Sequence, residues 1–135
     1  METEKQIIEM IDVPFVDIGE DRPAITAKKV VIEDVKLIKD IKKKDGTIVG
    51  DKIVCLCRHP DNKELLNISK VKYEKDGKIE SAALWYRTDM DGKIPYKSAL
   101  AFLLRFKGKK QIAQLKGEQI ETALDDEGYL ILKGY

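Results

Sequence analysis

The clearest hydrophobic pattern in the chain is an amphipathic segment near residue 100. Leu100, Leu103 and Leu104 recur at spacings of three and four, which places them on one face of a helix. Ser98 stands where a hydroxyl can accept a first-turn N–H, and Gly108 stands where a positive φ can end the helix. The pattern predicts one short helix between these two residues, with its apolar face against a sheet.

Most of the remaining chain has the short, Val- and Ile-rich runs of β-strands. Asp-Gly pairs at 45–46, 76–77 and 91–92 mark turns between several of these runs. We expect strands over the segments 28–39, 52–58, 65–75, 79–88, 119–124 and 129–133, with a bulge near Glu33-Asp34 in the first. The run KQIAQLKG predicts one further helical turn before the last hairpin.

This order of elements predicts a mainly β (α+β) fold with a single barrel domain over residues 28–135. We expect a small OB-like β-barrel of five to six antiparallel strands, with one short helix before the C-terminal hairpin. Closure into a barrel removes exposed sheet edges, and a plain α+β sandwich is the alternative. Residues 1–27 are expected to form an acidic N-terminal helix and a turn-rich linker.

The composition is that of an ordinary soluble protein, with 36% charged and 43% hydrophobic residues among 135. No apolar run approaches the roughly 20 residues that span a bilayer, and no secretory signal begins the chain. Cys55 and Cys57 are too close in sequence for an unstrained disulfide. These features predict a cytoplasmic protein with reduced thiols and no membrane contact.

The net charge of +1 conceals a strong segregation of charge along the chain. Residues 1–22 contain seven acidic and two basic residues, and residues 117–135 contain five acidic residues and one lysine. The intervening part carries a net charge of +10. A basic body of this kind can attract a polyanion, whereas the alternative is a lysine-rich surface that only maintains solubility.

The first candidate site is the single tryptophan and its neighbours. In a strand over 79–88, Trp85 and Arg87 lie on one face, and the preceding strand of the hairpin offers Lys70 and Lys72. An exposed aromatic ring beside cations is the arrangement that stacks a base and neutralises its phosphate. The alternative is that the only tryptophan of a small domain is a core residue.

The second candidate site is the basic segment at the end of the predicted helix. Its cations are Arg105, Lys107, Lys109, Lys110 and Lys116. Tyr96 and Lys97 lie at the other end of the helix, so the set could follow a phosphate backbone. The alternative is that these cations only complement the helix dipole. A third basic run, 42–44, is either a clamp loop or a guard against edge pairing.

The sequence offers little for catalysis or metal binding. Cys55, Cys57 and His59 would supply three ligands on one strand face, but no other cysteine or histidine completes a zinc site. No phosphate-binding glycine motif occurs, and the pair Asp125-Asp126 falls in a predicted turn. We therefore expect no enzyme activity, no metal and no cofactor.

The C-terminal half has a likeness to a known group. It is carried within residues 95–134 by the runs SALAFLLRFKG, LKG and DDEGYLIL. They resemble the C-terminal half of small OB-like single-stranded-DNA-binding proteins from phages and archaea. In that group a Ser-capped helix precedes an L-x-G and a final hairpin. The resemblance is carried by scaffold residues and implies the fold more than the function.

These observations predict a non-catalytic nucleic-acid-binding protein that prefers single-stranded DNA. Its expected contact residues are Lys70, Lys72, Trp85, Arg87, Tyr96, Lys97, Arg105, Lys107, Lys109 and Lys110. The acidic N-terminus is expected to compete for this face or to recruit other proteins. The alternative is a protein-interaction or structural accessory module of viral or plasmid type. The oligomeric state stays open, with a dimer as one option.

Overall fold

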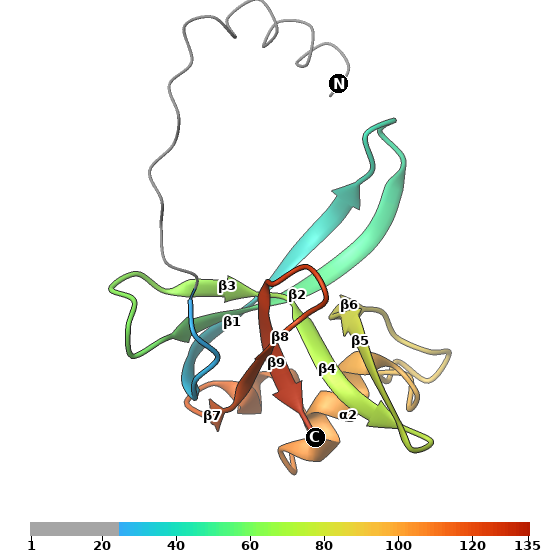
Figure 1. The fold of residues 1–135 in the computed structure, drawn as a ribbon. Helices are drawn as coiled ribbons and strands as arrows, with labels where there is room; N and C mark the ends of the chain where they lie inside the picture. The colour runs from blue at the N-terminus through green and yellow to red at the C-terminus, as the bar shows by residue number, and fades with distance from the viewer. Residues whose placement is uncertain (1–24) are drawn as a thin grey trace, which may run out of the picture.

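The computed structural model describes residues 25–135, which form two β-sheets and one α-helix (Figure 1). The expected acidic helix and most of its linker lie outside these residues. One sheet has the order β3-β2-β1-β7, with β6 paired to β2. Its strands are β1 Val30–Lys42, β2 Ile48–Arg58, β3 Leu66–Ile68, β6 Trp85–Tyr86 and β7 Gln119–Ile120.

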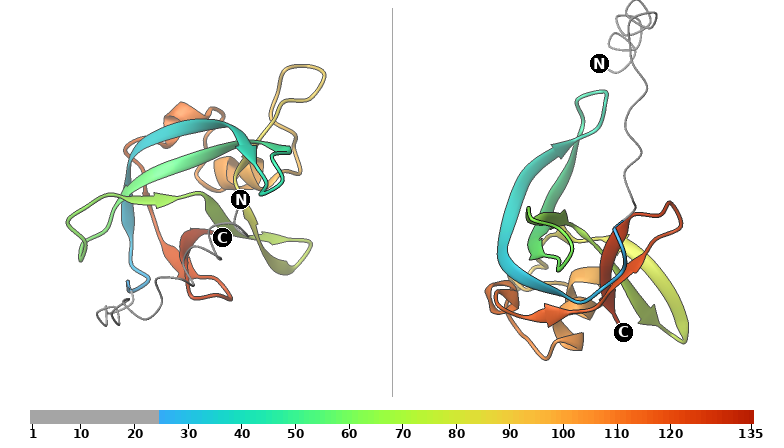
Figure 2. Two further views of the ribbon diagram at one scale, coloured as in Figure 1. Left: turned by 90° about the horizontal axis from the view of Figure 1, so that it is seen from above. Right: turned by 60° about the vertical axis from the view of Figure 1, so that its left-hand side comes forward.

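The second sheet has the order β5-β4-β9-β8. Its strands are β4 Lys70–Lys75, β5 Lys78–Ala83, β8 Thr122–Leu124 and β9 Leu130–Gly134. The predicted mainly β fold is confirmed, and strands β8 and β9 form a hairpin around the DDEG turn as expected. In both views of Figure 2 the strands curl around a common interior.

Three single residues carry the chain from one sheet to the other: Ser69 between β3 and β4, Leu84 between β5 and β6, and Glu121 between β7 and β8. Leu84 N–H donates to Ser69 O, and Ile53 N–H donates to Leu84 O, both at 2.8 Å. The expected continuous strands over 65–75, 79–88 and 119–124 are therefore wrong. Each strand bends at its crossing residue because the two sheets run in different directions.

The pairing of β4 with β9 is parallel, which corrects the expectation of antiparallel strands throughout. Parallel neighbours need a crossover connection, and the helix lies within the segment between these two strands. Gly134 faces Tyr73 across this pair. A Cβ atom on Gly134 would lie 2.9 Å from Val71 Cγ2, so glycine permits the close approach of the strands.

The predicted helix is α2, Ala99–Phe106, followed by the 3-10 turn η2, Ile112–Leu115. Ser98 Oγ accepts a hydrogen bond from Ala101 N–H at 3.2 Å, which confirms the predicted N-cap. The three leucines Leu100, Leu103 and Leu104 are buried in the core, as the spacing predicts. In Figure 1 and in the right-hand view of Figure 2, α2 lies at the end of the molecule away from the tip of the β1–β2 hairpin.

The β1–β2 hairpin extends beyond the body of the molecule as a long arm (Figure 1). Its register shifts between Ile32 and Asp34, which confirms the predicted bulge. The arm exposes large apolar side chains: Leu37, Ile38, Ile48 and Val49. The lysines at 42–44 lie at its tip.

The thiols and the histidine belong to the core. Cys55 and Cys57 are free and buried, and burial raises the pKa of both thiols to about 12. His59 Nδ1 accepts from Asp61 N–H at 3.0 Å, so Nε2 donates to Thr26 O at 2.6 Å. The ring thus fixes the start of the described chain to the loop that follows β2.

Candidate nucleic-acid interface

Strand β6 places the tryptophan at the surface, beside the root of the β1–β2 arm. Trp85 is 37% exposed and pairs with Lys52 of β2. Lys52 Nζ lies 4.7 Å from the centroid of the indole ring, a cation–π contact. The ring belongs to a hollow of about 280 Å³, the Trp85 hollow, formed by Val49, Gly50, Asp51, Trp85, Tyr86 and Arg87.

Trp85 acquires a different cationic neighbour from the one that the sequence suggests. A continuous strand over 79–88 would place Trp85 near Lys70 and Lys72 of β4. Because the chain changes sheet at Leu84, Trp85 leaves the sheet in which those two lysines pair with β5, and it pairs with Lys52 of β2. Arg87 remains beside Trp85 in the Trp85 hollow.

A larger pocket lies between the loop after β6, the C-terminal end of α2 and the segment before η2. It encloses about 720 Å³. Its lining residues are Tyr86, Thr88, Gly92, Lys93, Ile94, Tyr96, Ala101, Leu104, Arg105, Lys109, Lys110, Gln111 and Ile112. We call it the Tyr96–Arg105 pocket; it contains four cations and no carboxylate, and Tyr86 joins it to the Trp85 hollow.

Arg105 of this pocket lies against two aromatic rings. Its guanidinium carbon lies 3.9 Å from the centroid of the Tyr96 ring and 4.7 Å from that of Phe102. Among the described residues, no carboxylate forms an ion pair with Arg105. A stacked guanidinium keeps its N–H groups at the edge of the plane, where they are available to an anion.

Local hydrogen bonds fix the backbone at two of the three lysines of the Tyr96–Arg105 pocket, Lys93 and Lys110. Asp89 Oδ1 accepts from the backbone N–H of Lys93 at 3.0 Å and closes the loop at its base. Gln114 Oε1 accepts from the backbone N–H of Lys110 at 2.9 Å, within the cap of η2. Both backbones are held by side chains, while the lysine side chains themselves are exposed.

Two of the predicted cations contact the start of β7 and the residue before it. Lys107 Nζ donates to Gln119 O at 2.6 Å and lies 3.7 Å from a carboxylate oxygen of Glu118. Lys109 Nζ lies 3.3 Å from the other carboxylate oxygen. Lys107 lines a separate surface pocket, whereas Lys109 also lines the Tyr96–Arg105 pocket. Lys97 is exposed and lines neither the hollow nor the pocket.

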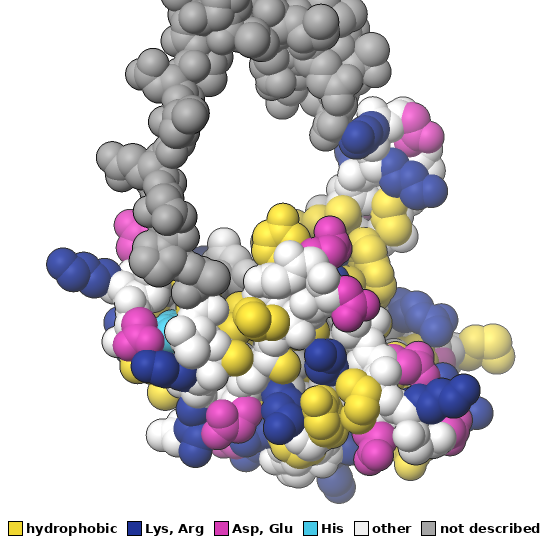
Figure 3. All heavy atoms as spheres, in the orientation of Figure 1, with side chains coloured by type: hydrophobic (Ala, Val, Ile, Leu, Met, Phe, Trp, Pro, Cys, Tyr) yellow, Lys and Arg dark blue, Asp and Glu magenta, His cyan; other side chains and the backbone are white. Residues whose placement is uncertain are grey.

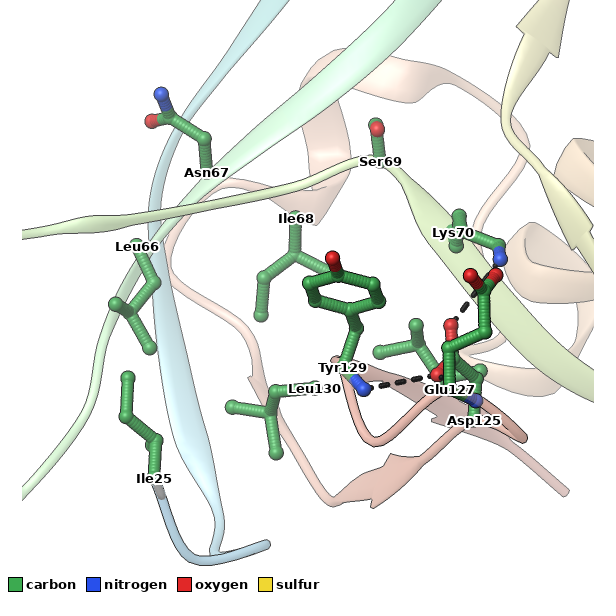
Figure 4. A pocket seen from close by; sticks show the side chains of 11 residues that line it. Ile25, Leu66, Asn67, Ile68, Ser69, Lys70, Asp125, Glu127, Tyr129 and Leu130 are labelled. Atoms are coloured by element: carbon green, nitrogen blue, oxygen red, sulfur yellow. Dashed lines mark hydrogen bonds and ion pairs between the residues drawn. The ribbon is translucent and has the colours of Figure 1, made fainter. Parts of the chain in front are cut away.

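Lys70 and Lys72 contact the β8–β9 turn and not the tryptophan. Lys70 Nζ lies 3.2 Å from Asp125 Oδ2, and Lys72 Nζ donates to Leu124 O at 3.1 Å. A pocket of about 470 Å³ adjoins this ion pair, between β3 and the turn that carries Tyr129 (Figure 4). Figure 3 shows basic and acidic side chains interspersed over the face seen there. This face therefore differs from the Tyr96–Arg105 pocket, whose lining contains no carboxylate.

The carboxylate of Asp125 organises that turn, which gives a test by pH. Hydrogen bonds from Tyr129 N–H, Lys70 Nζ and Glu127 N–H hold its pKa below the ordinary value. The pKa of an aspartate in the unfolded chain is about 3.9, and above this pH the lowered pKa of Asp125 stabilises the folded state. The stabilisation is lost as the pH falls through the pKa of the folded state. We expect Asp125→Asn to lower the urea midpoint at pH 7, with a difference from wild type that disappears in strong acid.

The matched control for this measurement is Asp126→Asn at the neighbouring exposed position. It should leave the urea midpoint close to that of the wild type at each pH. A constant difference between wild type and Asp125→Asn from pH 7 to pH 2 would contradict the assignment.

The structure thus brings part of the predicted set together. Trp85 and Arg87 share the Trp85 hollow, and four others line the Tyr96–Arg105 pocket: Tyr96, Arg105, Lys109 and Lys110. The sequence analysis missed Lys52, Tyr86 and Lys93. Lys93 could have been found, because it belongs to the same loop as Tyr96 and Lys97. Lys52 could not, because its contact depends on the change of sheet at Leu84.

Comparisons with protein family models, with curated proteins and with solved structures found no match for this chain. Among residues 25–135, no helix is both long and apolar enough to cross a membrane. The same residues contain no cluster of three or more side chains suited to a metal ion. What the interface binds must follow from its own residues and their geometry.

Proposed function

We propose that this protein is a non-catalytic nucleic-acid-binding protein that prefers single-stranded DNA. The observation that carries the proposal is the Tyr96–Arg105 pocket, which combines four cations with two tyrosines and no carboxylate. Tyr86 connects it to the Trp85 hollow, so cations and exposed rings follow one another along the surface. Proteins that bind single strands combine backbone-tracking cations with rings on which bases stack.

The preference for single strands follows from the exposed rings. Tyr96 is 73% exposed and Trp85 is 37% exposed, each with a cation against its ring. A base can stack on such a ring only when it is released from its own stack, as in a single strand. Stacking contributes about 1–3 kcal/mol per base without regard to sequence.

We also propose an OB-like barrel as the finer description of the fold. Five strand segments support it: β1, β2, β3 with β4, β7 with β8, and β9. Strand β1 pairs with β2 and with β7, β2 pairs with β3, and β9 pairs with β4 and β8, which joins all five in a ring. Helix α2 falls between the third and fourth segments. OB-folds are partly open barrels that bind oligonucleotides.

A cytoplasmic location suits the two free cysteines of the core. Cys55 and Cys57 are buried as thiols, and such unpaired thiols are typical of reducing compartments.

Titration with a short oligo-dT, followed by tryptophan fluorescence at several salt concentrations, tests the proposed function. The chain has one tryptophan, so the signal reports on the Trp85 hollow alone. We expect quenching, with a logarithm of the binding constant that falls linearly with the logarithm of salt concentration. Emission unmoved by oligo-dT, together with no complex in a gel shift, would contradict the proposal.

The arm supports a second candidate function, a protein-interaction module. It exposes the apolar side chains Leu37, Ile38, Ile48 and Val49, and exposed apolar side chains that gather on a surface are a feature of protein-interaction sites. In that case the cations serve solubility alone, and neither oligo-dT nor duplex DNA should shift the protein in a gel.

A further inference from the structure

We propose that the Tyr96–Arg105 pocket is a subsite for one unstacked nucleotide, able to bind a mononucleotide by itself. The base would lie against the exposed ring of Tyr96 and the apolar side of the pocket, with the phosphate at the edge of Arg105. The inference goes beyond the proposed function because it predicts small-molecule binding, and it rests on that function only in using the same residues.

The size of the pocket suits a ligand of this class. Its volume of about 720 Å³ falls within the roughly 300–1,000 Å³ of small-molecule sites. Four aliphatic side chains line it, and Tyr86 adds a half-buried ring; the four are Ile94, Ala101, Leu104 and Ile112. An apolar surface with a few polar groups at its edge is the usual composition of a ligand site.

The charge of the pocket selects for a phosphate. Lys93, Arg105 and Lys110 each lack an ion pair with a carboxylate of the described residues, whereas Lys109 is paired with Glu118. Three unneutralised cations around one cavity repel each other, and a phosphate removes that repulsion. The guanidinium of Arg105 matches phosphate oxygens with two parallel hydrogen bonds.

The aromatic geometry selects for a base beside that phosphate. Arg105 covers one face of Tyr96 at 3.9 Å, and the tyrosine is nevertheless 73% exposed. Most of the surface of Tyr96 is therefore accessible to a planar ligand. Because Arg105 also stacks on Phe102 at 4.7 Å, its position is set before a ligand arrives. Such preorganisation lowers the entropic cost of binding.

A free nucleotide and a nucleotide within a strand share this chemistry, and the experiment separates them. Amide shifts of the ¹⁵N-labelled full chain are followed during titration with dTMP, with thymidine and with inorganic phosphate. We expect dTMP to shift the amides of Lys93, Ile94, Tyr96 and Lys110 in a saturable way. Thymidine and phosphate alone should bind at least about tenfold more weakly, because each engages half of the site. Trp85 emission should stay unchanged with dTMP.

Variants identify the group that holds the phosphate. Arg105→Gln should weaken dTMP about tenfold, because it removes one charge-assisted phosphate contact. Arg105→Lys keeps the charge but loses the paired hydrogen bonds, so we expect an intermediate effect. Lys78→Gln, at an exposed position that does not line the pocket, should leave dTMP binding unchanged. The fold of each variant is checked by its thermal midpoint.

The outcomes separate this inference from the proposed function. Displacement of dTMP by oligo-dT would support both the subsite and the proposed function. It would show that one nucleotide of the bound strand occupies the pocket. Binding of dTMP without any binding of oligo-dT would support a site for free nucleotides and contradict the proposed function. If dTMP shifts no amide of the pocket while oligo-dT still quenches Trp85, the subsite is wrong and the proposed function stands. Shifts that persist unchanged in Arg105→Gln would likewise overturn the subsite.

Discussion

Replacing Lys93, Arg105 and Lys110 together by glutamine is expected to weaken binding of oligo-dT on the order of 100-fold at about 0.1 M salt. Each phosphate contact on a single strand contributes about 0.7 to the slope of log binding constant against log salt concentration. Three lost contacts lower the magnitude of the slope by about 2. Relative to 1 M salt, where this electrostatic contribution vanishes, that change corresponds to roughly two powers of ten at 0.1 M.

The matched control neutralises three other exposed lysines, Lys29, Lys63 and Lys78, which line neither the hollow nor the pocket. It changes the net charge of the protein by the same amount. We expect it to change oligo-dT binding only slightly, through the weaker long-range field. Equal losses in the two triple variants, measured by fluorescence titration, would show that total charge governs binding and that the Tyr96–Arg105 pocket does not.

Replacing Leu103 by alanine is expected to lower the free energy of unfolding by about 2–5 kcal/mol. Leu103 is completely buried on the inner face of α2. Its Cδ1 would lie 3.9 Å from a Cβ atom on Gly134, so it packs where β9 meets β4. Truncation leaves a cavity at the contact between the helix and the second sheet, and the neighbouring parallel strands leave little room to relax into it.

Urea denaturation at neutral pH measures this loss, with Phe106→Ala as the control on the same helix. Phe106 is 47% exposed, so its truncation should cost about 1 kcal/mol or less. A loss for Leu103→Ala no larger than that of the control would mean that α2 does not close the core. A small domain has about 5–15 kcal/mol of stability in total, so the expected loss is a large part of it.

Local features of the fold could be predicted well from the sequence. The cap at Ser98, the leucine spacing of α2 and the bulge before Asp34 all appear where residue chemistry places them. Each depends on residues within a few positions of one another, so the local pattern contains the whole cause. The final hairpin around 125–128 belongs to the same class.

The candidate site could be predicted only in part. The cations at the end of α2 were found because they follow one another in the chain, and the structure brings Arg105 and Lys110 into one pocket with Tyr96. The grouping of Trp85 with Lys70 and Lys72 failed. This grouping assumed that a continuous run of strand-forming residues stays in one sheet. The residues of such a run do not determine which strand it pairs with.

The sequence alone determined the helix, the hairpins, the mainly β composition and the concentration of basic charge between the acidic ends. Only the tertiary structure decided the crossings at Ser69 and Leu84, the parallel pairing of β4 with β9, and the partners of each lysine. The physical reason is the separation in sequence between the residues that interact. Caps, turns and apolar spacing depend on residues that are close in sequence. The pairing of Trp85 with Lys52 depends instead on how the whole chain closes around one core.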